Sequence, residues 1–152
     1  MTPRIDHAKR LIHAPPAKVA EAFARPDQYM QWLPPAGMTG RALVYDFREG
    51  GRYRIELTYA SPGAGKTSER TDISHGRFLA LDPGRRIVMS VEFDSADPAF
   101  AGEMIMTWTF APACRGTEVT VTAEQVPAGI SAEDHAEGLN STLENLARHV
   151  EA

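Results

Sequence analysis

The 152-residue chain has little cysteine and no long apolar run. Its one cysteine, Cys114, cannot form an internal disulfide, and such scarcity is typical of proteins in a reducing compartment. No stretch approaches the ~18 apolar residues of a membrane-spanning helix, and the first residues lack the apolar segment of a secretory signal. We therefore expect a cytoplasmic protein that does not insert into a membrane.

The sequence is also poor in patterns that bind nucleic acids, metals or nucleotides. Its 16 basic and 20 acidic residues give a formal charge of −4 and form no basic stripe, so we expect no nucleic-acid partner. No two of its five histidines have the i, i+4 spacing of a zinc-binding helix. Gly65-Lys66-Thr67 suggests a phosphate-binding loop, but Ala60 stands where that motif needs its first glycine. We expect no metal and no cofactor.

The length and the ordinary globular composition favour one domain over residues 1–152. A first strand over 5–13 is followed by two short helices, which begin after Pro15-Pro16 and end at Pro34-Pro35. From residue 43 the apolar residues recur with a period of two, which is typical of half-buried antiparallel strands. This alternation is found in the ranges 52–59, 86–93, 103–110 and 117–124. A further strand is expected over 71–81, where both faces mix polar and apolar residues and leave its facing open.

The chain finishes with a helix over 132–150, for which Ser131 is the expected N-cap. Leucines and a valine recur on one side of this helix at spacings of three and four. The order of elements predicts an α+β fold in which a curved antiparallel sheet of six to seven strands surrounds one long C-terminal helix.

A single helix is too narrow to cover so wide a sheet, since it spans two or three strands at most. The sheet must then curl around the helix, which predicts a cavity between them. Gly138 costs that helix about 1 kcal/mol relative to alanine, and such a cost is tolerated where close packing or open space is needed. The alternative is a dry core that the same side chains fill. The strand residues expected to face this interior are Tyr53, Ile55, Leu57, Met89, Val91, Met104, Met106 and Trp108.

Several segments resemble a known family in their order and spacing. Residues 10–15 (RLIHAP) with Trp32, residues 46–53 (DFREGGRY) and residues 116–120 (GTEVT) are similar to landmarks of the Hsp90-ATPase-activator-homologue-1-like family. That family lies within the START-like, or Bet v 1-like, superfamily. The resemblance implies a helix-grip fold and a hydrophobic small-molecule or lipid-like ligand. The family takes its name from a co-chaperone, so a chaperone partner is an alternative hypothesis.

The chain departs from the family pattern near the expected cavity. Leu139 follows Gly138 where the family often has an aromatic residue, and Ala20 replaces a common tryptophan in the first helix. Both changes put smaller side chains beside the cavity, so we add Gly138 and Leu139 to the expected ligand-binding residues.

Three hypotheses of function follow. The first is binding of a hydrophobic small molecule, with His75 as a polar group if its side of the strand faces inward. The second is a cofactor-independent cyclase, dehydratase or lyase in the same cavity, which would need a buried ionisable group, with His75, Arg77 and Glu92 as candidates. The third is a co-chaperone-like interaction module, which predicts an exposed apolar patch. No catalytic motif is found, so we expect binding rather than catalysis, with a homodimer possible.

Overall fold

The computed structural model describes residues 4–35, 37–60 and 70–151. The turn expected at 61–65 and the loop Gly65-Lys66-Thr67 lie outside the described residues. The helices are α1 (Pro16–Ala24), α2 (Pro26–Trp32) and α3 (Ala132–Glu151), with a short 3₁₀ turn η1 (Pro98–Phe100). The strands are β1 (Ile5–Ile12), β2 (Met38–Tyr45), β3 (Arg52–Tyr59), β4 (Thr71–Asp82), β5 (Arg86–Phe93), β6 (Met104–Ala113) and β7 (Gly116–Glu124).

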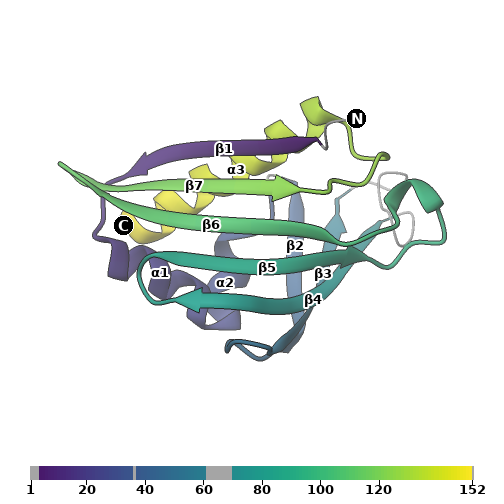
Figure 1. Ribbon diagram of the computed structural model, residues 1–152, viewed down its shortest axis with the longest axis horizontal. Helices are drawn as coiled ribbons and strands as arrows, with labels where there is room; N and C mark the ends of the chain where they lie inside the picture. Colours follow the sequence, from purple (N-terminus) through teal and green to yellow (C-terminus); the bar gives the residue numbers. More distant parts are fainter. Residues whose placement is uncertain (1–3, 36, 61–69, 152) are drawn as a thin grey trace.

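All seven strands of the described chain form one antiparallel sheet in the order β1-β7-β6-β5-β4-β3-β2. The sheet curls so that β2 and β3 lie behind β4 and β5, and α3 runs along its inner side (Figure 1). The α+β helix-grip architecture predicted from the sequence is therefore confirmed.

The inner side of the sheet and α3 share one core. The alternating residues of β5, β6 and β7 point inward, where Met89, Trp108 and Val121 are almost fully buried. The predicted stripe of α3 packs there as well, since Leu139, Leu143, Leu146 and Val150 are all buried. The expected N-cap also forms, because the Asp134 backbone N–H donates to the Ser131 hydroxyl over 3.0 Å.

The two short helices contribute more to this core than the sequence argument allowed for them. Phe23 of α1 packs edge-on against Trp32, Trp108 and Phe110, with ring centroids 4.7 to 5.4 Å apart. Edge-to-face contacts of this kind stabilise beyond the area that they bury. Aromatic rings from α1 and α2 thus fill one end of the space between sheet and α3.

Side chains also complete the C-terminal end of α1. The last carbonyls of a helix have no partner within it. Here the Trp32 indole N–H donates to the Ala22 carbonyl over 3.0 Å, and the Tyr45 hydroxyl donates to the Phe23 carbonyl. In contrast, the Trp108 indole N–H is buried without a hydrogen-bond partner among the described residues.

This contrast predicts different costs for two similar substitutions. Trp32→Phe should destabilise the fold by about 1–3 kcal/mol more than Trp108→Phe, because only the first leaves a buried carbonyl unpaired. Urea unfolding of both variants measures the difference. Both rings are 0–1% exposed, so lost packing is matched, and equal losses would contradict the role given to the Trp32 hydrogen bond.

Candidate functional site

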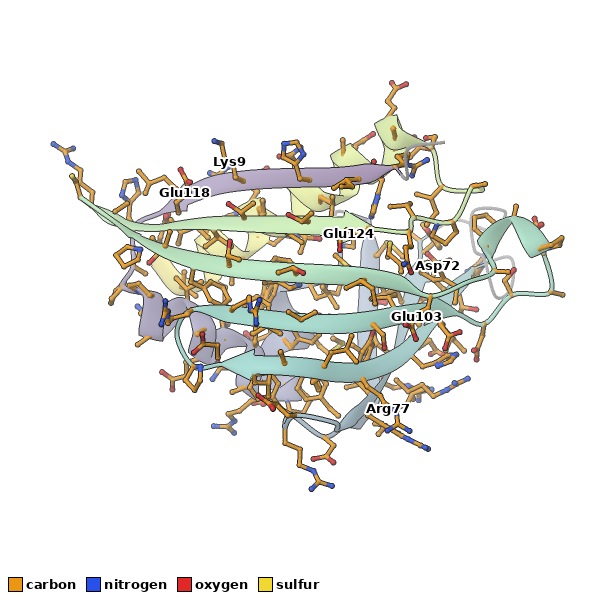
Figure 2. All side chains as sticks on the ribbon, in the orientation of Figure 1. Lys9, Asp72, Arg77, Glu103, Glu118 and Glu124 are labelled. Carbon is orange, nitrogen blue, oxygen red and sulfur yellow. The ribbon has the colours of Figure 1, made fainter. Side chains whose placement is uncertain are left out.

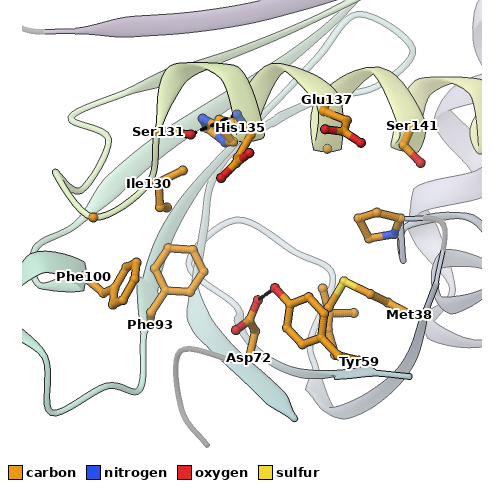
Figure 3. Close-up of a pocket in the computed structure, with 15 residues that line it drawn as sticks. Met38, Tyr59, Asp72, Phe93, Phe100, Ile130, Ser131, His135, Glu137 and Ser141 are labelled. Carbon is orange, nitrogen blue, oxygen red and sulfur yellow. Dashed lines mark hydrogen bonds between the residues drawn. The ribbon is translucent and has the colours of Figure 1, made fainter. Parts of the chain in front are cut away.

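A cavity of about 570 Å³ lies between α3 and the sheet (Figure 3). The first half of α3 forms one wall, and β2, β3 and β4 form the opposite wall. The turn η1 and residues 129–131, which lead into α3, close one end. The volume falls within the ~300–1,000 Å³ of small-molecule sites.

Large apolar side chains supply much of this lining. Phe93 and Phe100 lie together at one end with Ile130 above them (Figure 3). Met38 of β2 and Leu57 of β3 also line the cavity. These five residues come from four separate elements and one loop. An apolar molecule in the cavity would therefore be contacted from several directions.

The space exists because the facing side of α3 carries small or polar residues. Asp134, Gly138 and Ser141 follow one another at spacings of four and three and all line the cavity. A Cβ atom added at Gly138 would meet no atom of the described residues within 4 Å. Of the two reasons weighed for this glycine, open space therefore applies rather than close packing.

One polar group of the cavity is His135, whose imidazole is hydrogen-bonded to Asp6 of β1. His135 Nδ1 lies 2.7 Å from an Asp6 carboxylate oxygen, across 129 residues of sequence. Arg4 donates to both oxygens of the same carboxylate, over 3.1 and 3.0 Å. The side chains of His135 and Asp6 are only 13% and 8% exposed, so this contact is largely shielded from solvent.

The pKa of the Asp6 carboxyl is lowered in the folded protein. Its burial acts to raise the pKa of the carboxyl, but the hydrogen bonds from His135 and Arg4 outweigh burial and hold that pKa below its ordinary value. Asp6 is therefore ionised at neutral pH and can only accept hydrogen bonds.

The shift predicts a pH-dependent stability. A carboxyl whose pKa is lower in the folded state stabilises the fold above its ordinary pKa, and the contribution is lost as pH falls through the folded value. Asp6→Asn should therefore cost about 2 kcal/mol at about pH 5 and clearly less at about pH 3. Urea unfolding at both pH values is the measurement. The exposed Glu118→Gln provides a control that should change little at either pH, and a pH-independent loss for Asp6→Asn would contradict the assignment.

A second polar pair lies on the opposite wall. The Tyr59 hydroxyl donates to an Asp72 carboxylate oxygen over 2.7 Å, as the dashed line in Figure 3 shows. Burial first, and then the bond to Asp72, raises the pKa of the Tyr59 hydroxyl, which therefore keeps its proton at neutral pH. Its oxygen can still accept a hydrogen bond.

The residues expected from the sequence to bind the ligand are divided between the cavity and the core. Leu57 and Gly138 line the cavity. Met106 is half-buried and packs against the core. The others are buried within the core and do not line the cavity: Tyr53, Ile55, Met89, Val91, Met104, Trp108 and Leu139. The aromatic rings of α1 and α2 occupy the space that the sequence argument left empty.

His75 lies on the other side of the sheet. It borders a second hollow of about 350 Å³ together with Arg77 and Glu92, its two companions in the enzymatic hypothesis. Arg77 and Glu103, another residue of this hollow, lie on the outside of the sheet in Figure 2, with α3 behind it. His75 Nε2 is 3.1 Å from Asp94, which also pairs with Arg54. These three candidates therefore do not face the apolar cavity.

The polar residues of the cavity were not among the expected site residues. Asp6 and Asp72 carry a weak signal, because each takes an inward position in an alternating strand where an apolar residue is usual. His135 carries none, since a histidine in the first turns of a helix is ordinarily a surface residue.

Two further searches cover the described residues. No group of three or more His, Cys, Asp or Glu side chains within 4–35, 37–60 and 70–151 is placed to hold a metal ion. Over the same ranges, no helix is long and apolar enough to span a membrane.

The curled antiparallel sheet closed by one long C-terminal helix defines a helix-grip protein of the START-like, or Bet v 1-like, superfamily. Comparison with family models gives a match over residues 13–151 to "Activator of Hsp90 ATPase homolog 1-like protein". The match covers most of the chain, which belongs to this family. The resemblance noted in the sequence is thereby confirmed.

Solved structures share the fold. A protein from Chromobacterium violaceum is 34% identical, with a TM-score of 0.87 over 97% of both chains. An AHSA1-like protein from Aeromonas hydrophila is 19% identical, with a TM-score of 0.72 over 97% of this chain and 92% of the other. No curated protein matches the sequence.

Proposed function

We propose that the cavity beneath α3 binds a hydrophobic or lipid-like small molecule. The observation that carries this proposal is the open space facing Gly138 in a cavity of about 570 Å³ with large apolar walls. The helix accepts a cost of about 1 kcal/mol at this glycine, and no described neighbour packs closely enough to require it. Room for a ligand accounts for the cost.

Membership of the family supports the same proposal at the level of the fold. The strand residues that line the cavity are Met38, Leu57, Tyr59, Asp72 and Phe93, whereas most of the methionine and aromatic side chains of β5 and β6 lie in the core beside it. The scarcity of cysteine, with Cys114 exposed and free, supports a cytoplasmic site of action.

Methionine methyl groups provide a test with an internal control. Met38 lines the cavity, whereas Met89 is buried in the core and does not line it. In protein labelled with ¹³C at the methionine methyls, titration with 4-nonylphenol should shift the Met38 resonance and leave that of Met89 nearly unchanged. Native mass spectrometry of gently purified protein would show whether a ligand is carried along.

The interaction hypothesis predicts one exposed apolar patch. Among the described residues, the large apolar side chains that are exposed are Ile5 and Leu11 of β1, Leu43 and Val44 of β2, and Leu79 of β4. β1 and β2 are the opposite edges of the sheet, so these residues are spread over the surface rather than gathered. A chaperone partner and a homodimer stay predictions of the sequence.

A further inference from the structure

The contact with Asp6 places a proton on Nδ1 of His135. An ionised carboxylate only accepts hydrogen bonds, so the Nδ1 atom that lies 2.7 Å away must carry a proton. In the neutral imidazole the other nitrogen, Nε2, then has a free lone pair and acts as an acceptor. Arg4 holds the carboxylate from its other side and so keeps this arrangement in place.

The Nε2 atom of His135 makes no hydrogen bond within the described chain. The side chain of His135 makes its hydrogen bond within the described chain through Nδ1. Buried side-chain nitrogen or oxygen atoms without a partner in that part of the chain are limited to the Trp108 indole N–H. Nε2 is therefore accessible to solvent, and His135 itself lines the cavity.

The neighbouring polar groups favour a donor and disfavour an anion. Glu137 and Asp134 lie on the same turn of α3 as His135, and Tyr59 and Asp72 lie across from them (Figure 3). All four present acceptor oxygens, and the described lining residues include no Lys or Arg. A carboxylate or phosphate entering this cavity would meet like charge, and the apolar walls would penalise any unpaired charge.

We propose that the ligand is an amphipathic alcohol or phenol, whose hydroxyl donates a hydrogen bond to Nε2 of His135 while its apolar body contacts Phe93, Phe100 and Leu57. This inference rests on the proposed binding function and specifies its substrate class. Asp6 acts as a positioning residue, since it sets the tautomer and orientation of the imidazole without contacting the ligand.

Three probes that differ only in their head group isolate this hydrogen bond. 4-Nonylphenol donates through its hydroxyl, 4-nonylanisole replaces that hydroxyl by a methoxy group without a donor, and 4-nonylbenzoate is an anion. Their common flexible tail adapts equally to the walls. Calorimetric titration should give the phenol about tenfold higher affinity than the anisole, which corresponds to one hydrogen bond, with the benzoate weakest.

The same titrations with His135→Leu separate the two proposals. The variant should bind the anisole as well as the native protein does and should lose the preference for the phenol. Equal affinity of the native protein for phenol and anisole, or an unchanged preference in His135→Leu, would overturn the assignment to His135 while leaving apolar binding intact. Failure of all three probes to bind would remove the proposed function as well.

A spectroscopic measurement needs no substitution and covers the case in which the variant does not fold. In ¹⁵N-histidine-labelled protein, the free His135 should show a proton on Nδ1, the nitrogen that faces Asp6. Binding of 4-nonylphenol should shift the Nε2 resonance, whereas 4-nonylanisole should move it much less. A proton found on Nε2 and not on Nδ1, or no response of Nε2 to the bound phenol, would contradict the proposal.

Discussion

Replacing Gly138 with phenylalanine is expected to lower the affinity for 4-nonylphenol at least a hundredfold. The glycine lines the cavity, and no described atom lies within 4 Å of the position that its Cβ would take. A ring attached there enters the space meant for the ligand. Phenylalanine is also a better helix residue than glycine, so the fold should remain at least as stable.

Gly138→Ala is the matched control for this substitution. Its single methyl group occupies little of a cavity of about 570 Å³, so binding should change less than about threefold. Removal of the glycine should raise the free energy of unfolding by about 0.5–1 kcal/mol. Calorimetric titration and urea unfolding measure the two effects, and retention of binding by Gly138→Phe would place the ligand elsewhere.

Phe23→Ala is expected to cost about 3–5 kcal/mol of stability, the largest effect of any single change considered. The ring is 1% exposed and contacts four other aromatic rings, those of Tyr29, Trp32, Trp108 and Phe110. Its removal leaves a void between α1 and the sheet that these rigid rings cannot easily close. The loss would be a large fraction of the stability of an ordinary domain.

Leu79→Ala is the control for loss of apolar surface alone. Leu79 is 47% exposed on β4, and its truncation should change the free energy of unfolding by less than about 0.5 kcal/mol. Urea unfolding of both variants provides the comparison. A cost for Phe23→Ala as small as that for Leu79→Ala would show that the aromatic cluster is not the centre of the core.

Most of the fold could be predicted from patterns within single segments. The period of two in β3, β5, β6 and β7 and the apolar stripe of α3 each follow from one buried side, and that side was correctly identified. β2 was harder to recognise, because it is an edge strand that buries little and contains Gly40. A strand that buries few side chains shows only a weak alternation of apolar and polar residues.

The position of the cavity depends on packing between segments, which no single pattern records. The widths of the sheet and of α3 alone predict an open interior, because neither width takes account of the side chains of α1 and α2. Phe23 and Trp32 instead pack against Trp108, which was expected to meet a ligand. The remaining space lies beside the first half of α3, where the residues that face the sheet are small or polar.

The pairing of Asp6 with His135 depends on the same kind of long-range geometry. It joins residues separated by 129 positions and requires both the placement of β1 beside β7 and that of α3 along β1. The sequence shows only that Asp6 interrupts an inward apolar series. The partner that makes its burial tolerable becomes visible only in three dimensions.

The aromatic cluster and the cavity lie toward opposite ends of α3. The residues that contribute most to the stability of the fold are therefore largely different from those that would determine ligand specificity. A protein of this fold that keeps the aromatic cluster can therefore exchange side chains around the cavity with little loss of stability. Because the two regions are separate, a few substitutions around the cavity can change the ligand specificity and leave the stability of the fold nearly unchanged.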